Sequence, residues 1–212
     1  MNMVELFQVS KTIKKQQVLS NVNYKFQNGK IYGLYGPNGS GKTMILRMIT
    51  GLISPTEGVV KIDEKQLHQE ISFPPSVGLI IENMELLPNL TASENLKTLA
   101  TIKKIATDED IKNVLERVGL QTNKTVKKYS LGMKQRLNIA QAIFEKPMLI
   151  LLDEPTNALD EEGTELMYRI LKEEKKRGAC IIIATHNKSD LNVICDTILK
   201  INEGKIVEVM NE

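Results

Sequence analysis

The sequence has no long hydrophobic run. Its longest apolar stretches, such as residues 148–152, fall far short of the roughly 20 residues that a membrane-spanning helix needs. Residues 1–5 also lack the basic segment and the following apolar stretch that mark a secretory signal. We therefore expect a chain that neither spans a membrane nor is secreted.

Cysteine is scarce, and charge of neither sign is in excess. Cys180 and Cys195 both lie in apolar surroundings without metal-ligand spacing, which indicates reduced core residues and a cytoplasmic protein. The 28 basic and 26 acidic residues give a net charge of +2, so no large positive field points to nucleic acid as a partner. The chain also lacks internal repeats, and its 212 residues cannot contain two full nucleotide-binding domains.

A glycine-rich segment at residues 36–43 reads G-P-N-G-S-G-K-T, the pattern of a phosphate-binding loop. It follows an apolar strand-like run at 31–35 and precedes a helix-like segment at 44–49. In this context backbone N–H groups and the positive end of the helix surround phosphate oxygens. Lys42 is expected to reach the β- and γ-phosphates, and the Thr43 hydroxyl to ligate magnesium. The nucleotide contacts predicted here are Gly36, Pro37, Asn38, Gly39, Ser40, Gly41, Lys42, Thr43 and Met44.

The rest of the sequence falls into segments with strand-like or helix-like spacing of apolar residues. Short alternating segments at 6–9 and 22–26, with another at 59–62, predict a small antiparallel layer beside an α/β core. Helical patterns then replace strands, with Asp108 as the expected cap of the second helix. Strand and helix alternation resumes at residue 147. We therefore expect a core formed by 1–87 and 147–212, interrupted by a helical insert at 88–146.

Candidate catalytic residues follow the buried strands. The apolar strand at 149–152 ends in Asp153 and Glu154; the first acid of such a pair holds magnesium through water, and the second orients or deprotonates the attacking water. His186 follows the strand at 181–184, at the sheet edge where ligands bind in open α/β folds. There it can donate a hydrogen bond to a γ-phosphate oxygen. Glu82 is a further carboxylate at a strand end.

The segment at 129–136, Y-S-L-G-M-K-Q-R, opens a helix of the insert. Ser130 is a natural N-cap, so its hydroxyl and the neighbouring N–H groups form an anion site. The insert separates this anion site from the phosphate loop of the same chain. This separation suggests that the site binds the nucleotide of a second copy.

These motifs, together with the segment L-I-L-L-D-E-P-T-N-A-L-D at 149–160, resemble the ATP-binding-cassette (ABC) ATPases over nearly the whole chain. The resemblance implies that residues 1–212 form one ABC ATPase domain. Its fold would be a P-loop NTPase (RecA-like) parallel-sheet core with an N-terminal antiparallel β layer and an inserted helical subdomain. It also implies a head-to-tail dimer, in which two ATP molecules with Mg²⁺ lie between the phosphate loop of one subunit and the signature motif of the other.

The resemblance further assigns roles by position. The catalytic residues would be Glu154 as the general base, His186 and Lys42, and the metal ligands would be Thr43, Glu82 and Asp153. Ser130 and Gly132 would contact the ATP bound by the second subunit, and residues 157–160 would form a dimer contact.

Three features depart from the family pattern. Ile13 stands where an aromatic residue usually stacks on adenine, which removes a stacking contribution of roughly 1 kcal/mol. The signature reads Y-S-L-G-M instead of L-S-G-G-Q, and Glu82 replaces the usual glutamine of the switch loop. A carboxylate there is a stronger magnesium ligand, but it repels phosphate oxygens.

The I-E-N and L-T-A-S-E-N-L patterns within 81–96, with the signature segment, are similar to a subgroup that exports peptide antibiotics of the bacitracin and lantibiotic kind. This implies an ATPase that powers a separate integral membrane permease from the inner face of the cell membrane. We expect the permease to dock at residues 84–87, beside the switch loop.

Two other readings remain open at this point. One is a soluble cassette ATPase that serves iron–sulfur assembly or DNA maintenance. The other is a regulatory nucleotide binder, suggested by Ile13 and the altered signature, although Lys42, Asp153, Glu154 and His186 are all present. The sequence also leaves open whether the second ATPase subunit is identical or a different chain.

Overall fold

The computed structural model describes residues 2–81 and 85–211. In chain order its elements are β1 (Asn2–Ile13), β2 (Gln16–Gln27), β3 (Ile31–Tyr35), α1 (Lys42–Ile49), β4 (Glu57–Ile62), β5 (Lys65–Gln66), β6 (Val77–Ile80), α2 (Ala92–Lys103), α3 (Asp108–Arg117), a 3₁₀ turn (Val126–Lys128), α4 (Leu131–Ile143), β7 (Leu149–Asp153), α5 (Glu161–Lys176), β8 (Cys180–Thr185), α6 (Lys188–Ile194), β9 (Thr197–Asn202) and β10 (Lys205–Asn211). None of the helices in these two stretches is long and apolar enough to cross a bilayer.

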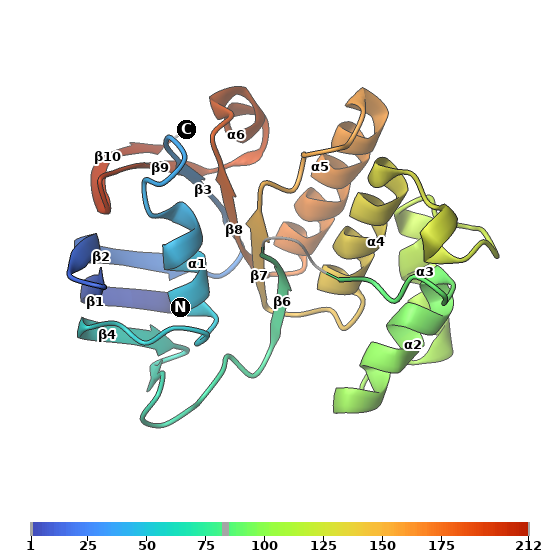
Figure 1. Cartoon of the computed structure of the whole chain (residues 1–212), viewed down its shortest axis with the longest axis horizontal. Coiled ribbons are helices and arrows are strands. Elements are labelled where there is room, and N and C mark those ends of the chain that lie inside the picture. The colour runs from blue at the N-terminus through green and yellow to red at the C-terminus, as the bar shows by residue number, and fades with distance from the viewer. Residues whose placement is uncertain (1, 82–84, 212) are drawn as a thin grey trace.

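The strands form two sheets. The larger has the order β10-β9-β3-β8-β7-β6, in which all neighbours are parallel except β10 and β9. The smaller is antiparallel, with the order β2-β1-β4-β5. Figure 1 shows this smaller sheet and the larger sheet on opposite sides of α1, with α4 and α5 beyond the larger sheet. The predicted α/β core with an antiparallel layer is confirmed.

The register of the parallel strands sets the position of the candidate site. The central strands β3, β7 and β8 are almost entirely buried, as expected for continuous apolar runs in a parallel sheet. Tyr35 pairs with Thr185, and Asp153 pairs with Ala184. The segments that follow these three strands therefore emerge side by side at one edge of the sheet.

Three helices, α2, α3 and α4, lie between β6 and β7 in the chain. The predicted capping box of α2 is present, because Thr91 accepts from the Glu94 N–H and the Glu94 carboxylate accepts from the Thr91 N–H. For α3, the prediction of Asp108 as the cap is wrong. Thr107 is the N-cap, because it lies three residues before Asp110 and can form the same reciprocal pair.

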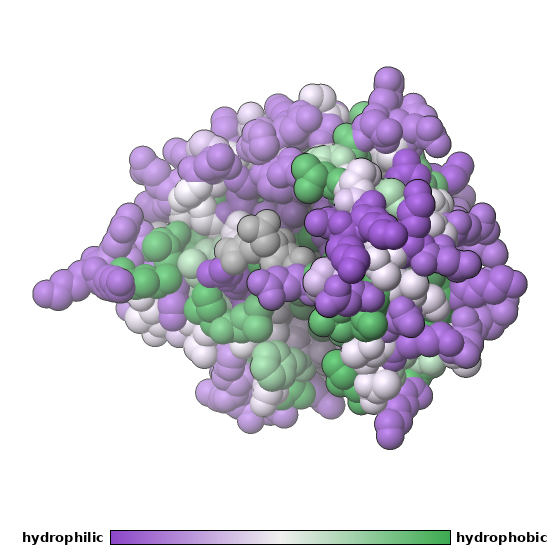
Figure 2. Space-filling view, turned by 45° about the vertical axis from the view of Figure 1, so that its right-hand side comes forward, coloured by the Kyte–Doolittle hydropathy of each residue, from purple (hydrophilic) through white to green (hydrophobic). Residues whose placement is uncertain are grey.

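An apolar groove lies between β6, the loop before it, and helix α2. Phe73, Val77, Leu99 and Ile102 are among the residues that line this cavity of about 550 Å³. Phe73 is 58% exposed and Ile102 is 77% exposed, so large apolar side chains stand open at its rim. Figure 2 shows hydrophobic side chains on both sides of a hollow in this face of the molecule.

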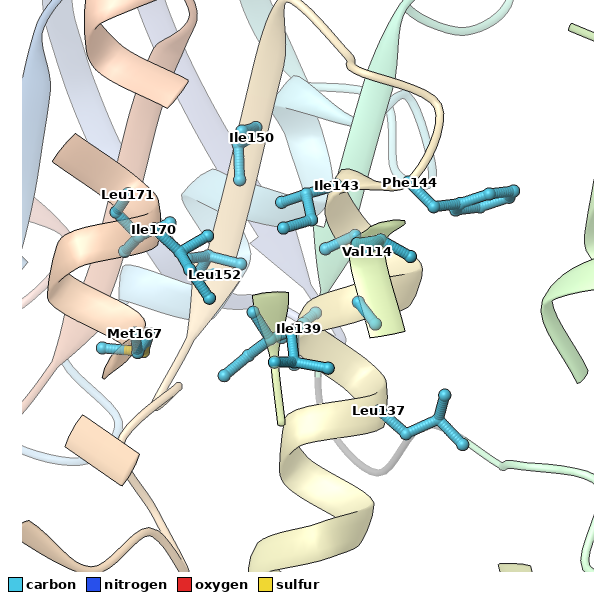
Figure 3. Packing of buried hydrophobic residues seen from close by; sticks show 14 of the residues in the cluster. Val114, Leu137, Ile139, Ile143, Phe144, Ile150, Leu152, Met167, Ile170 and Leu171 are labelled. Carbon is cyan, nitrogen blue, oxygen red and sulfur yellow. The ribbon is translucent and has the colours of Figure 1, made fainter. Parts of the chain in front are cut away.

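One buried hydrophobic cluster joins the larger sheet to helices α4 and α5. Ile139 and Ile143 of α4, Ile150 and Leu152 of β7, and Ile170 of α5 belong to one buried cluster. Figure 3 shows these side chains directed into the space between β7, α4 and α5. Because α4 packs on β6, which pairs with the strand that ends in Asp153, its first turn is held at a defined position relative to the sheet edge.

Candidate active site

The phosphate loop joins β3 to α1 in a conformation that only glycine tolerates at two positions. A Cβ on Gly36 would stand 2.1 Å from the Ile201 carbonyl oxygen, and Gly41 has a φ of 109°. Lys42 is buried at the start of α1, where its Nζ donates to the carbonyl oxygens of Gly36 (2.7 Å) and Pro37 (3.1 Å). Burial lowers the pKa of the Lys42 ammonium, and the carboxylates of Glu154 and Asp153 partly offset this.

A cavity of about 350 Å³ opens over this loop. It is lined by Val18, Asn38, Gly39, Gly41, Lys42, Thr43, Met44, Asp153 and Glu154. The Ser40 hydroxyl in the same loop is buried and lacks a hydrogen-bond partner among the described residues. Ser40 does not line the cavity, whereas Lys42 and the glycine-rich backbone do, and these are the groups that bind phosphate oxygens. The loop therefore suits a phosphate group.

A hydroxyl and a carboxylate meet at the floor of the cavity. Thr43 Oγ1 donates to Asp153 Oδ2 over 2.6 Å. Hard oxygen ligands of these two kinds are what Mg²⁺ prefers, with the remaining positions filled by substrate phosphates and water. Among the described residues no cluster of three or more His, Cys, Asp or Glu could hold a metal by itself. The donor set therefore fits a magnesium ion that arrives with a nucleotide.

Glu154 is held by the end of β8. Its backbone N–H donates to the Ala184 carbonyl (2.8 Å), and its φ of 46° is unusual for a residue other than glycine. Glu154 Oε2 accepts from the Thr185 hydroxyl (2.8 Å), while Oε1 accepts from the His186 N–H (3.0 Å) and lies 2.8 Å from His186 Nδ1. A strained backbone is typical of a functional residue, and Glu154 Oε2, with one contact, keeps a further acceptor position.

Sequence reasoning missed Thr185. This side chain is buried at the last position of β8, and its hydroxyl contacts the Glu154 carboxylate directly. The signal in the sequence is a hydroxyl residue that ends an apolar strand immediately before His186. It is a weak signal, because threonine is common in buried strands.

The structure brings Lys42, Thr43, Asp153, Glu154 and His186 together, but it does not place the signature residues with them. Ser130 caps α4 by accepting from the Met133 N–H (3.2 Å), and neither Ser130 nor Gly132 lines the cavity over the phosphate loop. Ile13 ends β1 and is 37% exposed, whereas Val18 is the apolar residue of β2 that lines the cavity. Glu82, expected as a magnesium ligand, lies outside the described residues.

Comparison with known proteins gives a consistent result. Residues 19–157 match the family model described as ABC transporter. The uncharacterized ABC transporter ATP-binding protein YybJ of Bacillus subtilis (strain 168) is 59% identical over 206 residues, which cover 96% of this chain and 94% of that protein. The bacitracin transport ATP-binding protein BcrA of Bacillus licheniformis is 41% identical, over 94% of this chain and 67% of that protein.

Two further relatives bear on transport and assembly. The lantibiotic transport ATP-binding protein SrtF of Streptococcus pyogenes is 37% identical over 97% of this chain and 89% of its own length. Among solved structures, the ATP-binding cassette MJ0796, described as a dimeric post-hydrolysis state bound to ADP and Pi, aligns with a TM-score of 0.88 and 28% identity. It covers 99% of this chain and 98% of that one. The chain therefore belongs to the ABC transporter family and is an ATP-binding, ATP-hydrolysing subunit.

Proposed function

We propose that the chain powers an exporter of peptide antibiotics or similar amphiphiles, as a head-to-tail dimer attached to a separate membrane protein. The observation that carries the hydrolytic part is the convergence of Lys42, Thr43, Asp153, Glu154 and His186 at one sheet edge. The names of BcrA and SrtF support the class of cargo. The dimeric ADP and Pi complex of MJ0796 supports the assembly.

In this proposal the phosphate loop binds the nucleotide. The Lys42 ammonium exchanges its contacts with Gly36 and Pro37 for β- and γ-phosphate oxygens, where it neutralises negative charge. Thr43 and Asp153 would hold Mg²⁺, and Glu82 is the proposed third protein ligand. Bound Mg²⁺ stabilises the charge that develops on the phosphate oxygens.

Glu154 acts as the general base. Its carboxylate orients a water molecule for in-line attack on the γ-phosphate and accepts the proton of that water. His186 uses Nδ1 to hold the carboxylate, which leaves Nε2 for a phosphate oxygen. Thr185 fixes the second carboxylate oxygen, so Glu154 retains only limited rotational freedom.

The start of α4 supplies the second half of each site in the dimer. Ser130 is exposed, and Leu131 beside it is 72% exposed, so this helix end is open to another molecule. With the helix dipole and the first N–H groups it can contact the γ-phosphate of the nucleotide bound to a second copy. Residues 157–160 lie next to this helix end and form the dimer contact.

The test is steady-state ATP hydrolysis with magnesium as a function of protein concentration. A dimeric enzyme gives a rate that rises faster than linearly with concentration. The matched control Glu154→Gln should lower kcat by about 10²-fold or more, because it removes the general base while retaining the shape of the side chain. The same variant should accumulate as an ATP-bound dimer in size-exclusion chromatography. A linear rate, or full activity in the control, would refute the assignment.

The apolar groove is the proposed docking surface for the membrane protein. The expected docking segment 84–87 is described only in part: Met84 lies outside the described residues, Leu86 packs against the core, and Leu87 is 46% exposed. The groove offers a larger apolar surface, because Phe73 and Ile102 stand at its rim. Large exposed apolar patches mark sites of protein association.

Docking is tested with Ile102→Asp, which places a charge at the groove rim. The variant should lose association with the membrane fraction of its native host while binding ATP with unchanged affinity. Val193→Asp makes the same chemical change at an exposed position of α6, outside the groove. Membrane association equal to wild type in Ile102→Asp would count against this surface.

A further inference from the structure

The side chain of Gln135 connects α4 to the residue that follows Glu154. Gln135 lies one turn into the helix, and its Nε2 donates to the Pro155 carbonyl oxygen over 2.8 Å. Its Oε1 accepts from Asn138 Nδ2 over 3.2 Å. Because both ends of the amide are engaged, the orientation of the Gln135 side chain is fixed.

Two further contacts join the same parts of the chain. A Cβ on Gly132 would stand 3.1 Å from the Ala158 carbonyl oxygen, so the first turn of α4 already touches the segment 155–160. An Arg136 nitrogen lies 3.7 Å from the Asp160 carboxylate, which also caps α5 through the Gly163 N–H. A displacement of the start of α4 must therefore move the segment that follows β7.

Glu154 lies between two anchors. On one side its carboxylate and its N–H are bound to β8 and to His186 immediately after it. On the other side the ring of Pro155 restricts the φ angle of that residue. A displacement of the Pro155 carbonyl therefore also displaces the Glu154 backbone. The φ of 46° at Glu154 shows that this backbone is already held away from its preferred conformation.

We propose that Gln135 is a positioning residue for Glu154. It couples the nucleotide contacted by the start of α4 to the general base of the same chain. This inference rests on the proposed head-to-tail dimer, in which Ser130 contacts the nucleotide of the second copy. Occupancy of one site would then adjust the geometry of the other through a link inside a single chain.

The effect of substituting Gln135 should depend on which chain of the dimer carries the substitution. A dimer with one active site is obtained by mixing wild-type chain with a large excess of Glu154→Gln chain. Gln135→Met removes the hydrogen bond at similar side-chain volume. Placed in the chain that retains Glu154, it should lower kcat roughly tenfold, because small misplacements of a catalytic group cost up to about 10²-fold. Placed in the Glu154→Gln chain, it should change kcat less than about twofold.

The two placements separate a positioning role from the alternatives. A role in contacting the nucleotide of the other copy would give the loss only when Gln135→Met is in the Glu154→Gln chain. A general folding defect would also raise the KM for ATP and weaken ATP-dependent dimer formation, both of which the proposal leaves unchanged. Gln121→Met, the same change at an exposed position, is the matched control. If Gln135→Met does not fold, Gln135→Glu removes the same donor and gives the same test.

Equal rates for both placements, or full activity with Gln135→Met in the chain that retains Glu154, would overturn the coupling alone. Absence of hydrolysis in the wild-type mixture would instead overturn the proposed dimeric ATPase, and the coupling with it.

Discussion

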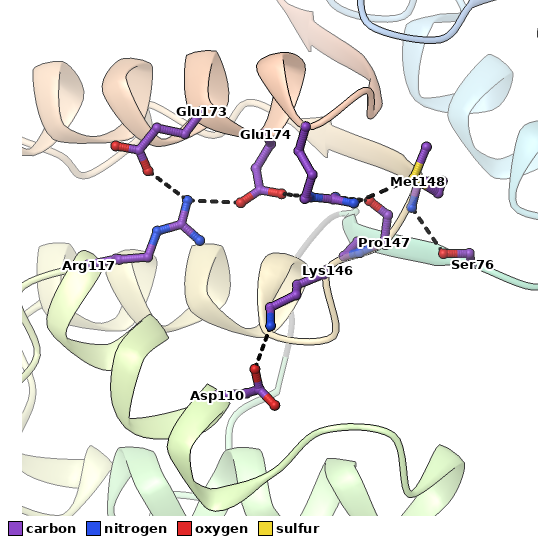
Figure 4. Close-up of polar contacts among 9 residues, drawn as sticks. Ser76, Asp110, Arg117, Lys146, Pro147, Met148, Glu173 and Glu174 are labelled. Carbon is purple, nitrogen blue, oxygen red and sulfur yellow. Dashed lines mark hydrogen bonds and ion pairs between the residues drawn. The ribbon is translucent and has the colours of Figure 1, made fainter.

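Replacing Glu174 by glutamine should destabilise the protein far more than the same change at its neighbour Glu173. Arg117 of α3 donates a hydrogen bond to Glu174 over 2.8 Å and another to Glu173 over 2.9 Å. Glu174 is 3% exposed and also accepts from Arg177 Nε (2.8 Å), whereas the Glu173 side chain is 52% exposed. Figure 4 shows Glu174 between two guanidinium groups, with Glu173 on the outer side of Arg117.

The magnitude follows from burial. Burial is the largest single influence on the pKa of the Arg117 guanidinium and lowers it, but the hydrogen bonds to Glu174 and Glu173 together raise it. The Arg117 guanidinium is therefore charged at any working pH. The two Glu174 oxygens accept from different arginines, so Glu174→Gln removes the negative charge between them and leaves one guanidinium facing an amide NH2 donor, which lowers the free energy of unfolding by about 2 kcal/mol. Glu173→Gln should cost less than about 0.5 kcal/mol, because exposed pairs are screened by water.

Thermal unfolding measures the difference. In a chain of this size 1 kcal/mol shifts Tm by roughly 2–4 °C, so Glu174→Gln should lower Tm by about 4–8 °C and Glu173→Gln by less than about 2 °C. Because Arg117 belongs to α3 and Glu174 to α5, the loss also loosens the contact between these helices. Equal shifts for the two variants would refute the argument from burial.

Three further predictions concern other parts of the chain. A Cβ on Gly78 would stand 1.7 Å from the Ala142 carbonyl oxygen, so Gly78→Ala should lower the free energy of unfolding by about 2 kcal/mol or more, measured by denaturant titration; a neutral result would contradict this contact. Ile13→Tyr should tighten ATP binding about fivefold through a stacking gain of roughly 1 kcal/mol, and an unchanged Kd in a fluorescence titration would argue against a base contact at this position. Hydrogen bonds from Lys146 and then from Thr107 lower the pKa of Asp110, so the stability they contribute is present above the unfolded pKa of about 4 and is lost as the pH falls toward the lowered value. The Tm deficit of Asp110→Asn should accordingly shrink below about pH 4, and a deficit independent of pH would exclude this linkage.

Features that depend on a few consecutive residues could be read from the sequence. The phosphate loop is one, because its glycines and Lys42 act within one turn of backbone between a strand and a helix. The buried strands and the capping box at Thr91 are others, since periodicity and hydrogen bonds over three residues determine them. Thr107 and Asp108 are adjacent and both residue types cap helices, so the sequence left the N-cap of α3 ambiguous. Thr107 rather than Asp108 forms it.

The amino-acid sequence by itself thus determined the ABC ATPase fold, the phosphate loop and the acids at the end of β7. Tertiary structure alone decided which groups from distant segments touch them. Thr185 reaches Glu154 because β7 and β8 are neighbours in a fixed parallel register, and Gln135 reaches Pro155 because α4 packs against the sheet through its buried face. Contacts of this kind join residues 20 and 31 positions apart in the chain, and only the packing of the core brings them within hydrogen-bonding distance.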